Sequence, residues 1–91
     1  MSFQRFYARV ISKTWLRTER GISLFSVVYQ GINDHGDPEP ERIIIQNTES
    51  LDSPNVGDVR FFQIQGETVP YDDPRHPQHE AWLQIKEDED R

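Results

Sequence analysis

The sequence predicts an all-β protein, a small barrel of five antiparallel strands. Apolar residues recur with a period of two along most of the chain, and no window of about 11 residues carries a helical stripe. Clusters of glycine, proline and polar residues divide the chain into short segments, as the turns of an antiparallel sheet require. Closure into a barrel would leave so small a sheet without exposed edges.

The first two strands are expected to form a long hairpin. Residues 4–17 form the first strand and residues 22–30 the second, with Gly21 in the turn between them, where positive φ is needed. Three more strands are expected at residues 42–46, 59–65 and 81–86, the fourth closed by Gly66 and Glu67. The polar, proline-containing segments between the strands are expected to be loops: 31–41, 47–56 and 69–80.

Length and composition limit the possible classes. A chain of 91 residues makes one domain, and we expect it to span residues 1–86, with 87–91 as an acidic solvated tail. The absence of cysteine excludes disulfides, a thiol nucleophile and a thiolate zinc site. No apolar run approaches the roughly 20 residues of a membrane span, and residues 1–9 lack the apolar region of a secretion signal. We therefore expect a cytoplasmic protein that does not bind membranes.

The first expected strand has two different faces, because successive strand residues point to opposite sides. One face is suited to a core and carries Phe6, Ala8, Val10, Ser12, Thr14 and Leu16. The other alternates cations with aromatic or aliphatic residues and carries Arg5, Tyr7, Arg9, Ile11, Lys13, Trp15 and Arg17. This second face is an unusual surface to expose to water.

The alternating face indicates binding of single-stranded nucleic acid, which is held by cations along the phosphates and by aromatic rings on which bases stack. Alternate strand residues stand about 6.6–7 Å apart, close to the repeat of an extended nucleotide chain. Phe25, Val27 and Tyr29 would lie beside this face, and residues of the fifth strand at its margin. The predicted binding residues are Arg5, Tyr7, Arg9, Lys13, Trp15, Arg17, Phe25, Tyr29, Trp82 and Lys86.

The charge distribution leaves a second class of function open. The net charge is −6, with five cations and one carboxylate in residues 1–30 but five cations and fifteen carboxylates in residues 31–91. The basic strand could capture a phosphate chain locally. Alternatively, the aromatic face is a protein interface or is shielded by the arginine stems. The protein would then be an acidic interaction module, a complex subunit or a phage or mobile-element inhibitor, that docks on a basic partner.

The order of these segments resembles the OB-fold. The stretch NVGDVRFFQIQGE at residues 55–67 contains Val56-Gly57-Asp58-Val59, which is similar to the start of the fourth strand in many OB domains. The resemblance covers most of the chain and implies an oligonucleotide-binding surface around strands two and three, where Phe25 and Tyr29 would lie. The connector before Val56 is too short and polar for the usual helix. An SH3-like barrel and an open meander are the alternative folds.

No residue pattern indicates catalysis. The chain has no glycine-flanked serine, no phosphate-cradling glycine loop and no nucleophile beside a base, so no enzyme and no cofactor are expected. His76 and His79 lack the spacing of a metal site, and no metal is expected. The OB-fold resemblance implies that the loop holding them, with Tyr71 and Arg75, borders the ligand groove. The sequence thus predicts an oligomeric protein that binds single-stranded DNA or RNA without sequence preference, with a protein partner as the alternative.

Overall fold

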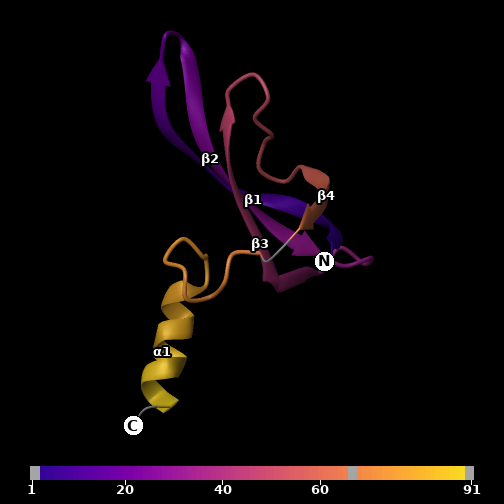
Figure 1. Cartoon of the computed structure of the whole chain (residues 1–91), viewed down its shortest axis with the longest axis vertical. Helices are drawn as coiled ribbons and strands as arrows, with labels where there is room; N and C mark the ends of the chain where they lie inside the picture. Colours follow the sequence, from indigo (N-terminus) through magenta and orange to yellow (C-terminus); the bar gives the residue numbers. More distant parts are fainter. Residues whose placement is uncertain (1–2, 66–67, 90–91) are drawn as a thin grey trace.

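The structure is a computed structural model that describes residues 3–65 and 68–89. Four antiparallel strands form one sheet, and a helix follows them (Figure 1). The elements are β1 (Phe3–Glu19), β2 (Ile22–Ile32), β3 (Pro38–Glu49), β4 (Val59–Gln65) and α1 (His79–Glu89). The predicted β-rich fold is confirmed, since strands make up most of the ordered structure.

The strand order is β3-β2-β1-β4. β1, β2 and β3 follow one another as hairpins, and β4 then returns to pair with the first half of β1. Three strands in sequence with a fourth lying beside the first make a Greek key. The alternative fold, an open meander, is therefore wrong, because β4 lies beside β1 and not beside β3.

The sheet does not close into a five-stranded barrel, and the expected fifth strand is wrong. Residues 81–86 belong to α1, and β3 and β4 remain at the two edges of the described sheet. Apolar and polar residues partly alternate in 81–86, as in a strand, but Ala81, Trp82 and Ile85 also lie on one side of a helix. Ala, Leu, Gln, Lys and Glu, which make up most of α1, favour helix. Glu80 in the first turn and Lys86 in the last complement the helix dipole.

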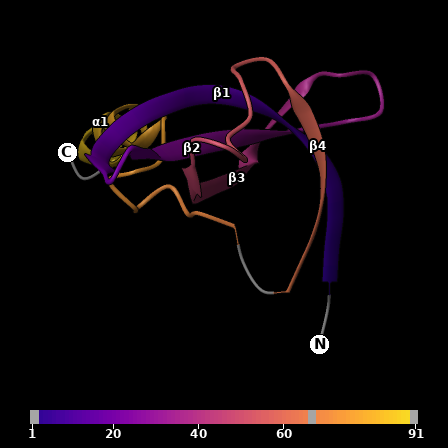
Figure 2. The ribbon, with the colours of Figure 1, turned by 90° about the horizontal axis from the view of Figure 1, so that it is seen from above.

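Two bulges interrupt β1. The register between β1 and β2 shifts at Ile11 and again at Leu16, which have no partner in β2. An extra residue in one strand bends that strand and increases its twist. Figure 2 shows the result, since β1 curves over the other strands as an arc.

The bulge at Ile11 moves the two halves of the predicted cation–aromatic face to opposite sides of the sheet. Before it, Tyr7 points outward and Phe6 inward; after it, Lys13 and Trp15 pair with inward-facing residues of β2. The predicted single face is therefore wrong. The outward residues of that set are Arg5, Tyr7, Arg9 and Arg17, the inward ones are Lys13 and Trp15, and Ile11 lies in the bulge. Ser12 and Thr14, predicted to face the core, point outward, and Leu16 is exposed.

The core fills the inner side of the curved sheet. Its buried members are Phe6, Ala8, Val10, Val27, Tyr29 and Ile44, with Phe25, Phe62 and Ile64 packed against them. The rings of Tyr29 and Phe62 meet edge to face with centroids 4.8 Å apart, although β1 lies between their strands. Ala8, on the inner side of β1, is small enough to let the curved sheet bring these two rings together.

The segment after β4 crosses to the opposite edge of the sheet. The Thr68 hydroxyl donates to the Glu41 carbonyl at 2.8 Å, and the Val69 amide donates to the Ile43 carbonyl at 2.9 Å. The chain then turns through residues 70–78 and enters α1, which contacts none of the described strands (Figure 1). Residues 87–89, expected in the tail, are helical. Residues 90–91, and Gly66 and Glu67, which were expected to close the fourth strand, lie outside the described residues.

In the described part of the chain, no helix has both the length and the apolar content to cross a bilayer.

Candidate nucleic-acid interface

An exposed patch of aromatic and cationic side chains lies on the outer side of the β1–β4 pair. The register places Arg5 opposite Gln63, Tyr7 opposite Phe61 and Arg9 opposite Val59. We call this surface the outer patch, and its members are Phe3, Arg5, Tyr7, Arg9, Val59, Phe61 and Gln63. None of these members carries a carboxylate, although the protein as a whole is acidic.

The aromatic rings of the outer patch are open to solvent. Phe3 is 54% exposed, Tyr7 56% and Phe61 54%. Tyr7 and Phe61 meet edge to face, with ring centroids 5.2 Å apart and ring planes at 60°. Exposed apolar patches are common at binding sites, so the outer patch is the candidate interface.

A hollow of about 390 Å³ borders the outer patch where β2 ends. Arg5, Tyr7 and Phe61 contribute to one wall, and Asp34 of the β2–β3 turn with Glu39 and Arg42 of β3 to another. The Arg42 guanidinium is 3.7 Å from the Glu39 carboxylate and 5.0 Å from the Phe6 ring centre. Its charge is therefore partly neutralised, and Arg5 is the hollow's other cation.

The second half of the predicted binding face forms a separate surface on the projecting β1–β2 hairpin. The Lys13 ammonium lies 4.4 Å from the centre of the Phe25 ring, and Trp15 lies opposite Phe25 across the hairpin. The Trp15 indole N–H donates to the Thr18 hydroxyl at 2.9 Å, which in turn lies 2.8 Å from the Ser23 hydroxyl. We call this surface the hairpin patch; its members are Lys13, Trp15, Thr18, Ser23 and Phe25.

The remaining predicted residues do not join either patch. Tyr29 is fully buried in the core, and Val27, expected beside it, is buried too. Arg17 lies near the hairpin tip, 3.6 Å from the Glu19 carboxylate. Trp82 and Lys86 are on α1, where the Lys86 ammonium lies 4.8 Å from the Trp82 ring centre. The structure therefore brings together only part of the predicted site.

Four members of the outer patch were missed in the sequence analysis: Val59, Gln63 and the two aromatic residues Phe3 and Phe61. A signal for Phe61 was present, because residues 59–65 are apolar on both parities. Phe62 and Ile64 suffice for the core side, which leaves Phe61 to face outward. Phe3 precedes the expected start of the first strand, and the sequence carries no signal for its position.

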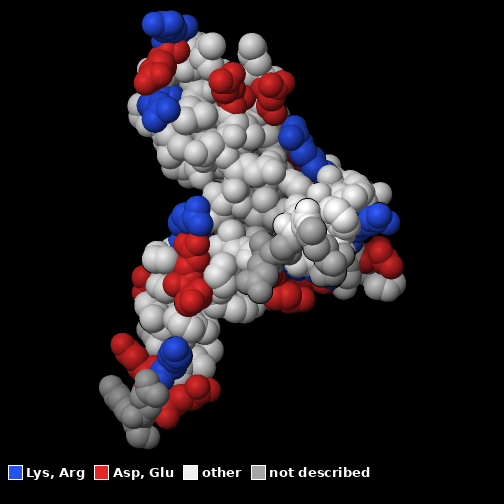
Figure 3. All heavy atoms as spheres, in the orientation of Figure 1, with Lys and Arg blue, Asp and Glu red and all other residues white. Residues whose placement is uncertain are grey.

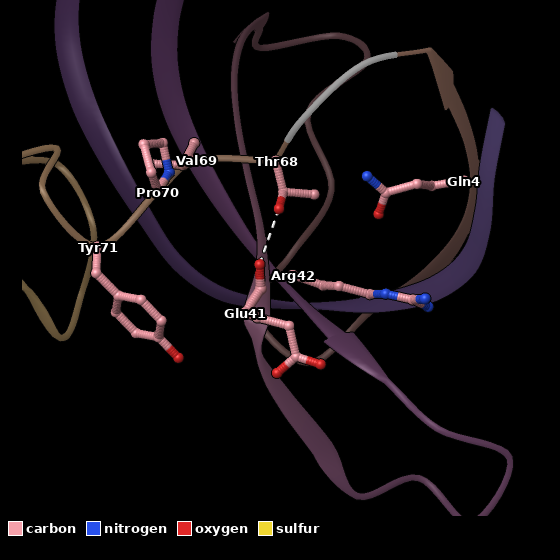
Figure 4. A pocket seen from close by; sticks show the side chains of 7 residues that line it. All are labelled: Gln4, Glu41, Arg42, Thr68, Val69, Pro70 and Tyr71. Atoms are coloured by element: carbon pink, nitrogen blue, oxygen red, sulfur yellow. Dashed lines mark hydrogen bonds between the residues drawn. The ribbon is translucent and has the colours of Figure 1, made fainter. Parts of the chain in front are cut away.

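Another hollow, of about 460 Å³, lies at the β3 edge (Figure 4). It is lined by Gln4, Glu41, Arg42, Thr68, Val69, Pro70 and Tyr71. In Figure 4 the Arg42 side chain extends toward Gln4, and the Glu41 carboxylate and the Tyr71 ring lie on another side of the hollow. Acidic and basic groups are mixed here, so this hollow has no charge preference for a phosphate.

The histidine loop lies along the β3 side of the sheet, away from the outer patch. Buried His76 accepts a hydrogen bond at Nδ1 from the Gln78 amide at 3.0 Å, and its ring lies 4.5 Å from the Tyr71 ring. His79 Nδ1 lies 2.8 Å from the Tyr71 carbonyl oxygen. Across residues 3–65 and 68–89, no group of three or more His, Asp or Glu side chains is placed to hold a metal ion.

One carboxyl in this loop has a displaced pKa. The Arg75 guanidinium donates to the Asp73 carboxylate at 2.7 Å, and this hydrogen bond is the main cause that lowers the pKa of Asp73 from 3.8 to about 2. Arg75 is exposed and Asp73 is half-buried, and both lie within the loop, so the pair orders the turn and takes no part in either patch.

Charge is mixed over the molecular surface. On the face shown in Figure 3, basic and acidic side chains alternate, and no continuous positive band crosses it.

Comparison with protein-family models, curated proteins and solved structures finds no match to this chain. The functional argument therefore rests on the geometry of the two patches.

Proposed function

We propose that this protein binds single-stranded DNA or RNA, with little sequence preference, through the outer patch. The observation that supports this function is the set of three exposed rings interleaved with Arg5 and Arg9 and free of carboxylates. Stacking of a base on an aromatic side chain contributes about 1–3 kcal/mol and accepts any base. The arginines would follow the phosphates on either side.

The spacing along β1 suits an extended strand of nucleotides. Tyr7 follows Phe3 by four positions along the strand, a distance of about 13 Å, and Arg5 lies between them. Phe61 lies beside Tyr7 and widens the stacking surface. Because this distance is about two repeats of an extended nucleotide chain, a strand that runs along β1 would place one base on Phe3 and the next but one on the Tyr7–Phe61 pair.

The topology supports the OB-fold resemblance within this proposal. OB-folds are partly open Greek-key barrels that bind oligonucleotides, and the four strands here have a Greek-key order. The proposed surface lies on β1 and β4, whereas OB-folds use mainly strands two and three. Because the rest of the chain is acidic, we expect capture to be local, weak and strongly dependent on salt.

The test is a titration of a fluorescein-labelled single-stranded oligonucleotide, as DNA and as RNA, followed by anisotropy at low and moderate salt. We expect binding that weakens with salt and that falls about tenfold in Tyr7→Ala and in Phe61→Ala, as the loss of one stacked base requires. Trp15→Ala is the matched control, because it removes an exposed ring from the other patch.

Tryptophan emission gives a second readout in the same titration. Neither tryptophan belongs to the outer patch, so binding there should leave the emission unchanged, whereas quenching of Trp15 would place the ligand on the hairpin patch. No binding of either nucleic acid at low salt would contradict the proposal and identify the outer patch as a protein interface.

A further inference from the structure

Among the described residues, the helix α1 lies against the preceding loop, where Tyr71 and Gln78 border it, but against none of the strands. It has 11 residues, and isolated helices shorter than about 12–15 residues are marginal in water. Helices of this length are stabilised mainly by packing of an apolar face. α1 contacts none of the described strands, so its apolar side is covered only in part by the loop and is available to a partner.

One side of α1 carries the groups for such a contact. Ala81, Trp82 and Ile85 are spaced three and four residues apart and contribute to the wall of a hollow of about 220 Å³. Ile85 is 61% exposed. Asp88 and Glu89 follow Ile85 by three and four residues, so the same side continues as a pair of carboxylates.

The hairpin patch has the complementary chemistry. Trp15 is 59% exposed and offers an apolar surface, while Lys13 supplies a cation on the same side of the hairpin. No member of the patch is acidic. The hairpin patch therefore matches the side of α1 described above: Trp15 could contact its apolar residues, and Lys13 could pair with its two carboxylates.

We propose that α1 of one copy docks on the hairpin patch of a second copy in a reciprocal two-fold dimer. The hairpin and α1 lie at opposite ends of the molecule, whose long axis measures 51 Å, so they do not meet within one chain (Figure 1). Two copies placed side by side with antiparallel long axes make both contacts at once. Each helix and each patch is then used, and the assembly closes as a dimer.

The wider charge distribution favours this arrangement. α1 carries four carboxylates against Lys86, namely Glu80, Glu87, Asp88 and Glu89. The hairpin carries three cations against Glu19, namely Lys13, Arg17 and Arg20. Ion pairs at such exposed positions contribute little each, but like charges across the contact would oppose it, so charge sets the pairing more than the affinity.

The test is sedimentation equilibrium of the full chain and of two charge-reversed variants, Lys13→Glu and the double variant Asp88→Lys/Glu89→Lys. We expect the wild type to dimerise and each variant alone to dissociate at least about tenfold more readily. An equimolar mixture of the two variants should recover the dimer. In the mixed dimer, one contact joins the original acidic helix to the original Lys13, and the other joins the lysine-bearing helix to the glutamate at position 13. A wild type that remains monomeric, or a mixture without recovery, overturns the proposal.

A matched control separates this dimer from nucleic-acid binding. Arg5→Glu reverses a cation on the outer patch and should weaken oligonucleotide binding while leaving dimerisation unchanged. Lys13→Glu should have the opposite pair of effects. Far-UV circular dichroism adds a structural readout, because dilution below the dimer range should reduce the helical signal of the wild type, and constant helicity on dissociation would contradict the role of docking in stabilising α1.

Discussion

The rings of Tyr7 and Phe61 meet edge to face on the outer side of the β1–β4 pair, with centroids 5.2 Å apart. Their neighbours in sequence, Phe6 and Phe62, meet on the inner side with centroids 6.2 Å apart. Two neighbouring cross-strand pairs of β1 and β4 therefore supply one aromatic pair to the core and another to the surface. Stability and ligand binding should be separable by mutation at adjacent positions.

Replacement of adjacent residues tests this separation. Phe6→Ala should lower the free energy of unfolding by about 3–5 kcal/mol, because it empties a buried site. Tyr7→Ala should change the unfolding free energy by much less and weaken oligonucleotide binding instead. Urea denaturation and fluorescence anisotropy measure the two effects, and a variant pair with equal losses in both would contradict the assignment of sides.

The salt dependence of binding should report the arginines of the outer patch. If Arg5 and Arg9 each neutralise one phosphate, Arg5→Ala and Arg9→Ala should each reduce the slope of log affinity against log salt by about 0.7. Arg20→Ala, in the hairpin turn, should leave the slope unchanged. An equal effect of all three substitutions would indicate capture by overall charge and not by the patch.

Gly31 should not tolerate a side chain. A Cβ atom at this position would lie 2.6 Å from Cβ of Arg42 and 3.2 Å from its carbonyl oxygen. Gly31→Ala should therefore cost about 1–3 kcal/mol of unfolding free energy, as overpacking does. Adding Arg42→Gly should cost less in the Gly31→Ala background than in the wild type, and a strictly additive double variant would exclude the clash.

The hydroxyl of Tyr29 should be a net cost to the core. The side chain is fully buried, and the oxygen has no hydrogen-bond partner among the described residues. Burial of an unpaired hydroxyl costs about 1–3 kcal/mol, so Tyr29→Phe should raise the free energy of unfolding by about 1 kcal/mol. Thermal and urea denaturation measure this change, and a destabilised variant would mean that the hydroxyl is hydrogen-bonded.

The Asp73–Arg75 pair predicts an acidic titration. Because the pKa of Asp73 is lowered from 3.8 to about 2, the stabilisation of the turn is complete above 3.8 and is lost as the pH falls through about 2. Carboxyl NMR should place the midpoint near the lower value. Arg75→Gln should return it toward 3.8, while Arg42→Gln, a cation outside this loop, should not move it.

Much of the sheet could be predicted because local patterns determine it. The hairpin around Gly21, the strand at residues 59–65 and the inward row of Phe6, Ala8 and Val10 all follow from period-two alternation and turn residues. β3 extends beyond the expected strand at both ends, and at its start it includes Pro38 and Pro40, residues that usually interrupt strands. Proline is tolerated at the start of a strand and at a sheet edge, where a missing amide costs no ladder hydrogen bond.

The candidate site was harder to predict because the bulges leave no signal in composition. Ile11 and Leu16 are ordinary strand residues, with no glycine beside them, so an unbroken alternation was the natural expectation. One unpaired residue was enough to place Trp15 on the opposite side from Tyr7. The strand predicted at residues 81–86 was wrong for another reason, because the pattern of a short apolar segment fits both a strand and a helix.

The pairing of β1 with β4 also sets the order in which the chain can fold during synthesis. Phe3 pairs with Gln65, so the first half of β1 must wait until β4 has been made, whereas β1 and β2 close locally around Gly21. Long-range closure of this kind slows folding. A nascent chain that ends before β4 leaves Phe6 without the cover of Phe62 and keeps an edge of β1 unpaired, which is the state most prone to aggregation.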